Sequence, residues 1–559
     1  MEPPTKRPCL RLLKRGPGIR HEGLVIDSDS ELGSDPISEG EESVESSSSE
    51  WQGSSSSSEY MPGSPASRRP KRGAAWSPYR GPTPHKMKYQ DVPSDASTGI
   101  SSGGSSTSSG SSRFPDTCWA SSMFEPLRQP FAAAAKEGLG SRALKLGTDC
   151  SGAEAPWFAL KAIIGELASK MSLTLDVQHR FACDILPVSQ QFIVQNSKPA
   201  VLFSDLVERS ETGYCLQAEM HVPVPSNLDL YVAGFPCKDF SILNSNRPCL
   251  QGPHASAFHG VVDYIKRHQP ATFLLENVQG LTMRKKGQAK APITQVLDIL
   301  RGLDGYQVKG WSVNSADYHL PQNRLRVYIV GVHRRAKLRK PLNAWSPYIQ
   351  ESMASTPKVP AHSFLLDDAE MEIQAELERL ETFRLEHGRI DTGREGRWKQ
   401  SHSKLRKELG VRPDEGQLIP KGCGWSRFLS QRTQDTLELQ AVRMARKKGI
   451  TEAKDVLSSE FFAEISRSVL YGSFREAQTP CLTPGSKIWI FSKQRWLIGP
   501  EMLALQGFPV DELNLDGLKD QNLRLLAGNA MSVPVVGLFL YLILAFVQFD
   551  SEPVAETLD

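Results

Sequence analysis

Two regions of the chain differ in the spacing of their apolar residues. Residues 1–140 hold few aliphatic residues among many Ser, Gly and Pro, whereas from Leu144 onward short apolar runs alternate with stretches of helical periodicity. The first apolar runs each end in an aspartate, at residues 144–149, 179–184 and 200–205. Strands that alternate with helices favour a parallel, doubly wound α/β sheet. The pattern predicts a disordered tail followed by an α/β domain.

The next apolar run, residues 228–235, stops abruptly at Pro236 and Cys237. Proline fixes its own φ and has no N–H, so the backbone before Cys237 is stiff and the sulfur is aimed. The following run, residues 271–278, also ends in a polar group, Glu276. In open α/β sheets, ligands bind beyond the carboxyl ends of the strands. A thiol and a carboxyl at two successive strand ends are therefore expected to share a pocket.

A third polar group opens an alternating apolar strand within residues 313–332. Gln322, Arg324 and Arg326 occupy alternate positions there. Two arginines at i and i+2 point the same way from an extended backbone. They can bracket an anionic group or a pyrimidine carbonyl, although an exposed arginine pair seen alone is most simply surface.

The last pattern lies near the end of the chain, where Asn529, Ser532 and Pro534 precede the longest apolar run, residues 535–547. This run is short for a membrane span, so it predicts a buried terminal helix and no membrane partner. Pro534 suits the first turn of that helix.

Taken in order, these segments resemble the motifs of the cytosine-C5 methyltransferases. The Phe-Pro-Cys sequence around Cys237 is similar to the family's nucleophile loop, and Glu276 begins a matching Glu-Asn-Val. Arg324 and Arg326 belong to a matching Gln-x-Arg-x-Arg sequence. The resemblance implies a Rossmann-like, S-adenosylmethionine-dependent methyltransferase fold. It also implies that Cys237 adds to C6 of cytosine while a protonated Glu276 binds N3.

The resemblance also implies a binding site for S-adenosylmethionine. Its residues would be Asp149, Cys150, Ser151, Gly152, Asp184, Asp205, Asn529 and Ser532. The first four would form the loop around the methionine part, Asp184 would bind ribose and Asp205 adenine. Acids at strand ends suit such contacts, although a single acid caps the following helix about as often. The loop departs from the family, which usually has Phe and several glycines where this chain has Cys150, Glu154 and Ala155.

The composition of the chain argues against some classes of site, and its charge pattern indicates a cellular compartment. The nine cysteines are odd in number and form no CxxC pair, which argues against a disulfide framework and against a zinc site. The net charge of +3 is too small to identify a nucleic-acid binder. Basic clusters within residues 6–20 and 67–88 flank an acidic block in the tail. They are typical of nuclear-import signals or nucleic-acid arms and predict a nuclear protein, with solvated charge runs as the alternative.

The chain is expected to consist of five segments. These are a disordered tail (1–140), the first part of the catalytic domain (141–333), an inserted region (334–490), the closing motifs with the final helix (491–550) and a short tail (551–559). The insertion is too long for a loop and predicts a small domain. By resemblance it recognises the target, and its basic clusters suit phosphate contact or are merely solvated helix faces.

These observations predict a DNA (cytosine-5-)-methyltransferase that acts on double-stranded DNA and flips its target cytosine out of the stack. Two alternatives stay open. Transfer RNA would require the same catalytic residues, so RNA is a second candidate partner. A non-catalytic, nucleic-acid-binding relative would keep the fold, and the altered first loop favours it. The oligomeric state does not follow from the sequence.

Overall fold

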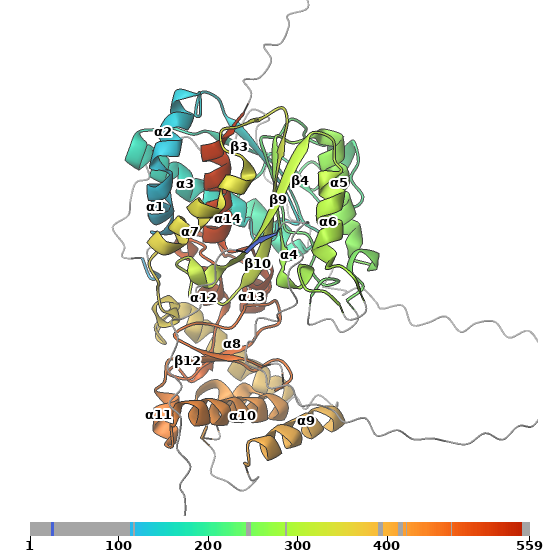
Figure 1. Ribbon diagram of the computed structural model, residues 1–559. Coiled ribbons are helices and arrows are strands. Elements are labelled where there is room, and N and C mark those ends of the chain that lie inside the picture. Colours follow the sequence, from blue (N-terminus) through green and yellow to red (C-terminus); the bar gives the residue numbers. More distant parts are fainter. Residues whose placement is uncertain are drawn as a thin grey trace, which may run out of the picture. The chain divides into compact units, whose positions relative to one another are not determined.

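The computed structural model describes residues 24–26, 112–115, 118–241, 247–285, 288–388, 395–411, 418–420, 422–470 and 472–549. All of them belong to one of the two units into which the chain divides, namely residues 1–28 with 97–559. Within this unit a mainly parallel sheet carries helices on both faces (Figure 1). This confirms the predicted doubly wound α/β methyltransferase fold.

Among the described residues, the main sheet has the strand order β1-β9-β10-β8-β7-β2-β3-β4-β5-β6. The strands are β1 (Leu24–Ile26), β2 (Leu144–Asp149), β3 (Val177–Cys183), β4 (Leu202–Phe203), β5 (Thr212–Cys215), β6 (Met220–Pro223), β7 (Leu230–Ala233), β8 (Thr272–Val278), β9 (Tyr306–Asn314) and β10 (Leu325–His333). Strands β8, β7, β2, β3 and β4 run parallel, and the outer strands pair antiparallel. The predicted strands therefore lie at adjacent positions in the centre of the sheet.

The central strands read as unbroken apolar runs because both of their faces are buried. In β7, Leu230 and Val232 belong to one core, and Tyr231 and Ala233 belong to the other. Helices α5 (Ala255–His268) and α6 (Pro292–Arg301) cover one face. The other face is covered by α1 (Trp119–Phe124), α2 (Arg128–Lys136), α3 (Ala155–Met171), α7 (Ser346–Ser355) and α14 (Val533–Phe546), and α4 (Pro187–Asn196) follows β3.

Part of the predicted tail belongs to the folded domain. Helices α1 and α2 lie inside residues 1–140, and Trp119, Phe124 and Phe131 are buried. The ring of Trp119 contacts that of Tyr541 in α14 at 6.4 Å, and the Tyr541 hydroxyl donates to the Ala120 carbonyl at 3.0 Å. All residues of α14 are buried, so its outer side needs a cover that α1 and α2 supply. The expected boundary at residue 140 is therefore too late, and β1 adds a further strand to β9. The charge blocks of the tail lie outside the described residues.

The inserted region contains its own helices and a small sheet of order β13-β12-β14-β15. Its elements are α8 (Met371–His387), α9 (Glu395–Glu408), α10 (Gln431–Lys448), α11 (Ala453–Leu457), β12 (Phe461–Glu464), β13 (Phe474–Glu476), β14 (Ile488–Ile490) and β15 (Arg495–Trp496). Two boundaries differ from the prediction. The small sheet runs past residue 490, and α7 packs on the catalytic sheet, where Trp345 stacks on Trp311 at 6.0 Å.

The chain returns to the catalytic domain through α12 (Gly499–Ala504), α13 (Asp520–Asn529) and α14, and β16 (Val547–Gln548) pairs with β11 (Lys337–Leu338). Arg495 joins the insertion to this part because its guanidinium contacts Glu501 at 2.8 Å and the Leu366 carbonyl at 3.1 Å. Within the described part of the chain, no single helix is long and apolar enough to cross a membrane. Helices α13 and α14 pass that test only together, as a bent pair.

Candidate active site

Cys237 lies shortly after β7 in a loop that is fixed from two sides. Phe235 and Phe240 are buried, with ring centroids 6.0 Å apart. The N–H groups of Phe240 and Ser241 donate to the Cys237 carbonyl at 3.0 and 2.9 Å. The Asn277 amide at the end of β8 donates to the Phe235 carbonyl at 3.0 Å. The thiol is thus held at a defined place beside the end of β8.

Glu276 and Arg326 meet beside this loop. Strands β8 and β10 pair antiparallel, and Arg326 lies two residues along β10 from the partner of Glu276, on the same face. The Arg326 Nε lies 3.2 Å from the Glu276 Oε1. At Gly234 a Cβ would lie 3.0 Å from Met531 and 3.8 Å from the Glu276 Oε2. A side chain at this position would therefore crowd Met531, which packs against the backbone of the loop.

The protonation of the two groups follows from their burial. Burial raises the pKa of Glu276, and Arg326 and Arg324 oppose this. Burial also raises the pKa of the Cys237 thiol, and Glu276 raises it further, while the same two arginines oppose the shift. Burial therefore works against ionisation of both groups, and the two arginines work in favour of it.

The two arginines of the motif have different partners. Arg326 reaches Glu276, whereas Arg324 is buried and donates to the carbonyls of Leu482 at 2.8 Å and Ala530 at 2.7 Å. Arg324 therefore joins the segments around Leu482 and Ala530 to β10, and it makes no direct contact with the Glu276 carboxyl. Both arginines contact the Cys481 sulfur, at 3.7 and 3.6 Å, whereas only Arg326 contacts the Glu276 carboxyl.

Two further acids lie at the tips of neighbouring strands, Asp184 after β3 and Asp205 after β4. The Gly152 N–H donates to the Asp184 carboxylate at 2.9 Å, which ties the first loop to β3. Each acid is followed by an exposed apolar residue: Ile185 is 66% exposed and Val207 is 52% exposed. Carboxylates that accept from hydroxyls, beside exposed aliphatic groups, suit a ligand that has a sugar and a flat ring.

Comparison with known proteins agrees with this arrangement. The family model described as C-5 cytosine-specific DNA methylase matches residues 164–541, more than half of the chain. The chain belongs to the C-5 cytosine-specific DNA methylase family. The family's methyl donor is S-adenosylmethionine.

Individual relatives of this family differ in coverage. A DNA (cytosine-5-)-methyltransferase DMT5 of Cryptococcus neoformans is 31% identical over 74% of this chain, and one of Verticillium dahliae is 25% identical over 70%. The chain spans only 18% and 19% of these two relatives. The type II methyltransferase M.HpaII of Haemophilus parainfluenzae is 40% identical over 20% of this chain and 30% of its own length.

Solved structures were compared as well. The Dnmt2 methyltransferase of S. pombe is 15% identical and has a TM-score of 0.36, and a putative DNA modification methyltransferase of an E. coli prophage is 17% identical and has a TM-score of 0.40. Each comparison covers 72% of this chain and 98% of the other.

The strand-tip residues of this C-5 methylase fit its family's cofactor. Gly152 has a φ of +57°, and nothing lies within 4 Å of the position of a Cβ there. The first loop therefore faces open space beside Asp184. In S-adenosylmethionine, hydroxyls and an amine would meet the carboxylates of Asp184 and Asp205, and the adenine would meet Ile185 and Val207.

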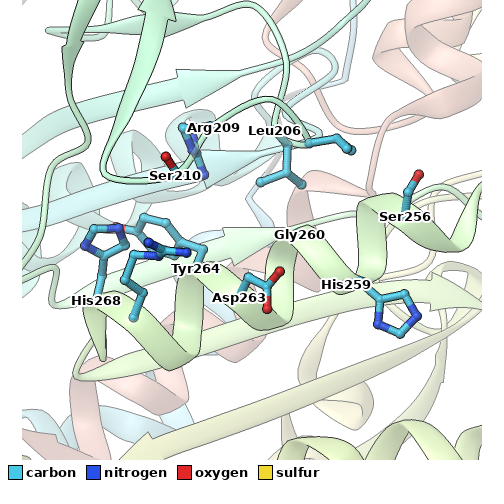
Figure 2. Close-up of a pocket in the computed structure, with 11 residues that line it drawn as sticks. Leu206, Arg209, Ser210, Ser256, His259, Gly260, Asp263, Tyr264 and His268 are labelled. Carbon is cyan, nitrogen blue, oxygen red and sulfur yellow. The ribbon is translucent and has the colours of Figure 1, made fainter.

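Asp149 has a different environment. Its carboxylate accepts hydrogen bonds from Arg209 at 2.5 Å and from the Tyr231 hydroxyl at 2.6 Å. Arg209 comes from the loop after β4 and lies 4.7 to 5.1 Å above the rings of Phe181, Phe203 and Tyr264. Figure 2 shows this loop facing α5, across a cavity of about 240 Å³. The Asp149 side chain therefore joins the sheet to this loop, and its contact with the cofactor stays a prediction.

The first loop keeps a strained shape without the family's glycines. Cys150, Gly152 and Glu154 all have φ near +50° to +57°, a region that costs a non-glycine residue roughly 1–2 kcal/mol. Buried contacts hold the loop in place: Thr148 donates to Glu154 at 2.5 Å, and the Ser151 hydroxyl accepts from the Cys183 N–H at 3.1 Å. Burial raises the pKa of Glu154 to about 8, so this group is mostly protonated at neutral pH. The departure in sequence leaves the turn of the loop in place.

The predicted residues of the closing motif are not equivalent. Asn529 is exposed at the end of α13, whereas Ser532 is buried and its hydroxyl donates to Gln506 at 3.1 Å. Gln506 also accepts from the Gln322 amide at 3.0 Å. This network joins the arginine motif to the start of α14, and cofactor contact by Asn529 and Ser532 stays a prediction.

Sequence reasoning missed three residues of the site. Ile185 and Val207 could have been noticed because they lie one and two residues after a predicted ligand acid, Asp184 and Asp205 respectively. Cys481 could not, because no motif surrounds it. The structure nevertheless places its sulfur 3.7 Å from Arg324 and 3.6 Å from Arg326. Among the predicted residues, Cys237, Glu276 and Arg326 come together, and Asp184, Asp205 and Gly152 form a second group.

Proposed function

We propose that this protein transfers a methyl group from S-adenosylmethionine to C5 of cytosine in double-stranded DNA. The observation that carries the proposal is the meeting of Cys237, Glu276 and Arg326 at the carboxyl ends of β7 and β8. The thiol and the carboxylic acid serve two different atoms of one pyrimidine ring, and the guanidinium holds the acid.

The reaction follows from what each group does. The Cys237 thiol loses its proton and forms a bond to C6, which moves an electron pair toward C5 and N3. Glu276, whose pKa burial raises, acts in its protonated form, donates a hydrogen bond to N3 and stabilises the charge that develops there. Arg326 holds the Glu276 carboxyl in position. The cofactor supplies an electrophilic methyl group to C5. Loss of the C5 proton and departure of the sulfur from C6 then restore the aromatic ring.

The target base has to leave the helix. C6 of a stacked cytosine offers no approach to a thiol fixed in a loop, so the nucleotide is extruded into the pocket. The proposed place of the extruded ring is between the Cys237 loop and the Glu276 carboxyl, because both groups act on it.

The inserted region is proposed to hold the DNA. Its helices α9 and α10 end in basic turns, with Arg406 and Lys407 in one and Arg446, Lys447 and Lys448 in the other. Arg406 contacts Asp435, and Lys448 contacts Glu476, so these two cations are partly neutralised. Cationic contacts with phosphates make DNA binding strongly dependent on salt.

We also propose a nuclear location, on the basis of the basic clusters of the tail. Localisation of a fluorescent fusion with and without residues 1–111 tests it.

Methyl-transfer assays with labelled S-adenosylmethionine test the proposal. The substrates are unmethylated duplex DNA, the same duplex with 5-methylcytosine at every cytosine, and transfer RNA. We expect label to appear in the first substrate alone. Transfer to transfer RNA without transfer to the unmethylated duplex would contradict the proposed substrate. Transfer to the fully methylated duplex would contradict the proposed position of methylation.

A further inference from the structure

A second thiol lies in the catalytic pocket. Cys481 belongs to the segment between β13 and β14, which runs beside the start of β10: the Thr479 N–H donates to the Pro321 carbonyl at 2.7 Å, and the Asn323 N–H donates to the Thr479 carbonyl at 3.1 Å. This pairing brings the Cys481 sulfur to 3.7 Å from the Arg324 Nη1 and 3.6 Å from the Arg326 Nη2. The inserted region therefore contributes a side chain to the catalytic arginines.

The same guanidinium reaches the catalytic carboxyl. Arg326 contacts Glu276 through Nε at 3.2 Å and Cys481 through Nη2 at 3.6 Å. One cation thus lies between an acid and a thiol, and it stabilises a negative charge on either of them. A negative charge on the sulfur makes ionisation of the carboxyl less favourable.

The charge balance of the arginine pair points to the sulfur. Both guanidiniums are buried or nearly so and remain charged at any pH that proteins tolerate. Their other hydrogen bonds go to neutral carbonyls, of Leu482 and Ala530 for Arg324 and of Leu325 for Arg326. Among the described side chains that they contact directly, Glu276 and Cys481 are the groups that can carry a negative charge. If Glu276 keeps its proton, as the reaction requires, the sulfur is the group left to balance the cations.

We propose that Cys481 is a thiolate that acts as the counterion of Arg324 and Arg326 and so leaves Glu276 protonated for its bond to N3. This inference rests on the proposed function, and it makes Cys481 a positioning residue.

The electrostatics of the pocket agree with this assignment. Burial alone would raise the pKa of Cys481, but Arg326 and Arg324 outweigh it and lower the pKa below its ordinary value. The pKa of Cys237 in the same pocket is raised, because burial and Glu276 outweigh the arginines there. The charged or titratable groups that face this cluster are Arg324, Arg326 and Tyr328 of β10, Glu276 of β8 and Cys237. Two thiols of one site are therefore predicted to ionise in different pH ranges.

The first test measures ionisation without activity. The full chain is treated briefly with iodoacetamide between pH 5.5 and 9.5, and alkylation of each cysteine is quantified by peptide mass spectrometry. We expect Cys481 to reach half of its maximal rate well below pH 8.5, the ordinary thiol value, and below the midpoint of Cys237. In Arg326→Gln the midpoint of Cys481 should rise, while that of the exposed Cys118 stays unchanged. A Cys481 midpoint at or above that of Cys118 would overturn the inference.

The second test uses an isosteric pair of variants, Cys481→Asp and Cys481→Asn. The first keeps a negative charge beside the arginines and the second removes it with almost no change of volume. Without a negative charge at position 481, Arg326 stabilises the ionised form of Glu276 and so lowers the pKa of that carboxyl. The decline of methyl transfer on the alkaline side of the pH profile should therefore begin at a lower pH. We expect the rate of Cys481→Asn relative to wild type to fall roughly tenfold between neutral and alkaline pH, which corresponds to one pH unit. Cys481→Asp should keep the wild-type profile, and equal profiles for the two variants would refute the inference.

The two tests separate this inference from the proposed function. A low alkylation midpoint of Cys481 without methylation of DNA would support the thiolate and contradict the proposed substrate. If the alkylation midpoint of Cys481 is that of an ordinary thiol while methyl transfer is normal, Cys481 is not the counterion and the proposed reaction still stands. Cys118→Ser, which changes an exposed thiol far from the arginine pair in sequence, serves as the control for the second experiment, and the Cys118 thiol itself is the reference in the first.

Discussion

The buried ion pair between Arg209 and Asp149 gives the sharpest prediction of stability. The side chain of Arg209 is 2% exposed and that of Asp149 is fully buried, and they contact at 2.5 Å. Replacing Arg209 by Met keeps most of the packing against Phe181 and Tyr264 but leaves the carboxylate without a cationic partner, with the Tyr231 hydroxyl and the Cys183 thiol as its remaining side-chain donors. Breaking a buried pair by removing one partner costs about 3–5 kcal/mol, so Arg209→Met should lower the free energy of unfolding by that amount.

This loss should depend on pH. Burial already works to raise the pKa of Asp149, and Arg209 is the main opposing influence. In Arg209→Met the pKa of the folded state will lie further above that of the unfolded chain. A carboxyl with a raised folded-state pKa favours folding only while it is protonated, so stability is lost as the pH rises above the unfolded value. The difference between variant and wild type should therefore be smaller at pH 5.5 than at pH 8.

Thermal and urea-induced unfolding, followed by tryptophan fluorescence at both pH values, would measure the effect. A loss of this size corresponds to a decrease of roughly 10 °C in the unfolding midpoint. The control is the double variant Arg209→Met, Asp149→Asn, which removes the orphaned charge and should recover about half of the loss. The reasoning is refuted if Arg209→Met changes the free energy by less than about 1 kcal/mol, or if the double variant is no more stable than the single one.

Three other changes test separate parts of the structure. Glu276→Gln keeps the shape of the side chain but loses the acidic proton, so kcat should fall roughly 10²–10⁴-fold while calorimetry finds unchanged cofactor affinity; a near-normal kcat would exclude Glu276 as the acid. Ile185→Ser together with Val207→Ser should weaken S-adenosylmethionine binding by about 10-fold or more in calorimetry, because exposed apolar contact with the adenine is lost; an unchanged Kd would place the adenine elsewhere. Gly331→Ala would bring a Cβ within 2.1 Å of the Phe273 ring, so urea unfolding should show a loss of about 1–3 kcal/mol, and an unchanged midpoint would contradict this packing.

The sequence allowed the centre of the fold to be predicted because its strands are buried on both faces. The run at residues 144–149 matches β2 in full, and the run at 271–278 matches β8 except for its first residue. The meeting of Cys237 and Glu276 followed from the same rule, since the ends of adjacent parallel strands share one edge. Both predictions depend on short sequence patterns, namely apolar runs and the polar residues at their ends, and not on contacts between segments far apart in the chain.

What could not be predicted depends on segments far apart in the chain. Arg324 and Arg326 look equivalent in the sequence, and they separate only because residues 481–482 and 530 return beside β10. Arg209 stands in a loop without periodicity, and its role follows from the position of Asp149 in the sheet. The helices α1 and α2 were missed because they are short apolar segments, made of aromatic residues, alanines and Met123, within a region that is otherwise polar.

The central claim is that Cys237 forms a covalent bond with a flipped cytosine whose N3 is bound by Glu276. A duplex oligonucleotide with 5-fluorocytosine at target positions tests it directly, because fluorine at C5 prevents the final elimination. In the presence of S-adenosylmethionine, we predict a denaturation-resistant protein–DNA adduct whose mass maps to the peptide containing Cys237, and no adduct with Cys237→Ser. An adduct at another residue, or an equal yield from Cys237→Ser, would contradict the account.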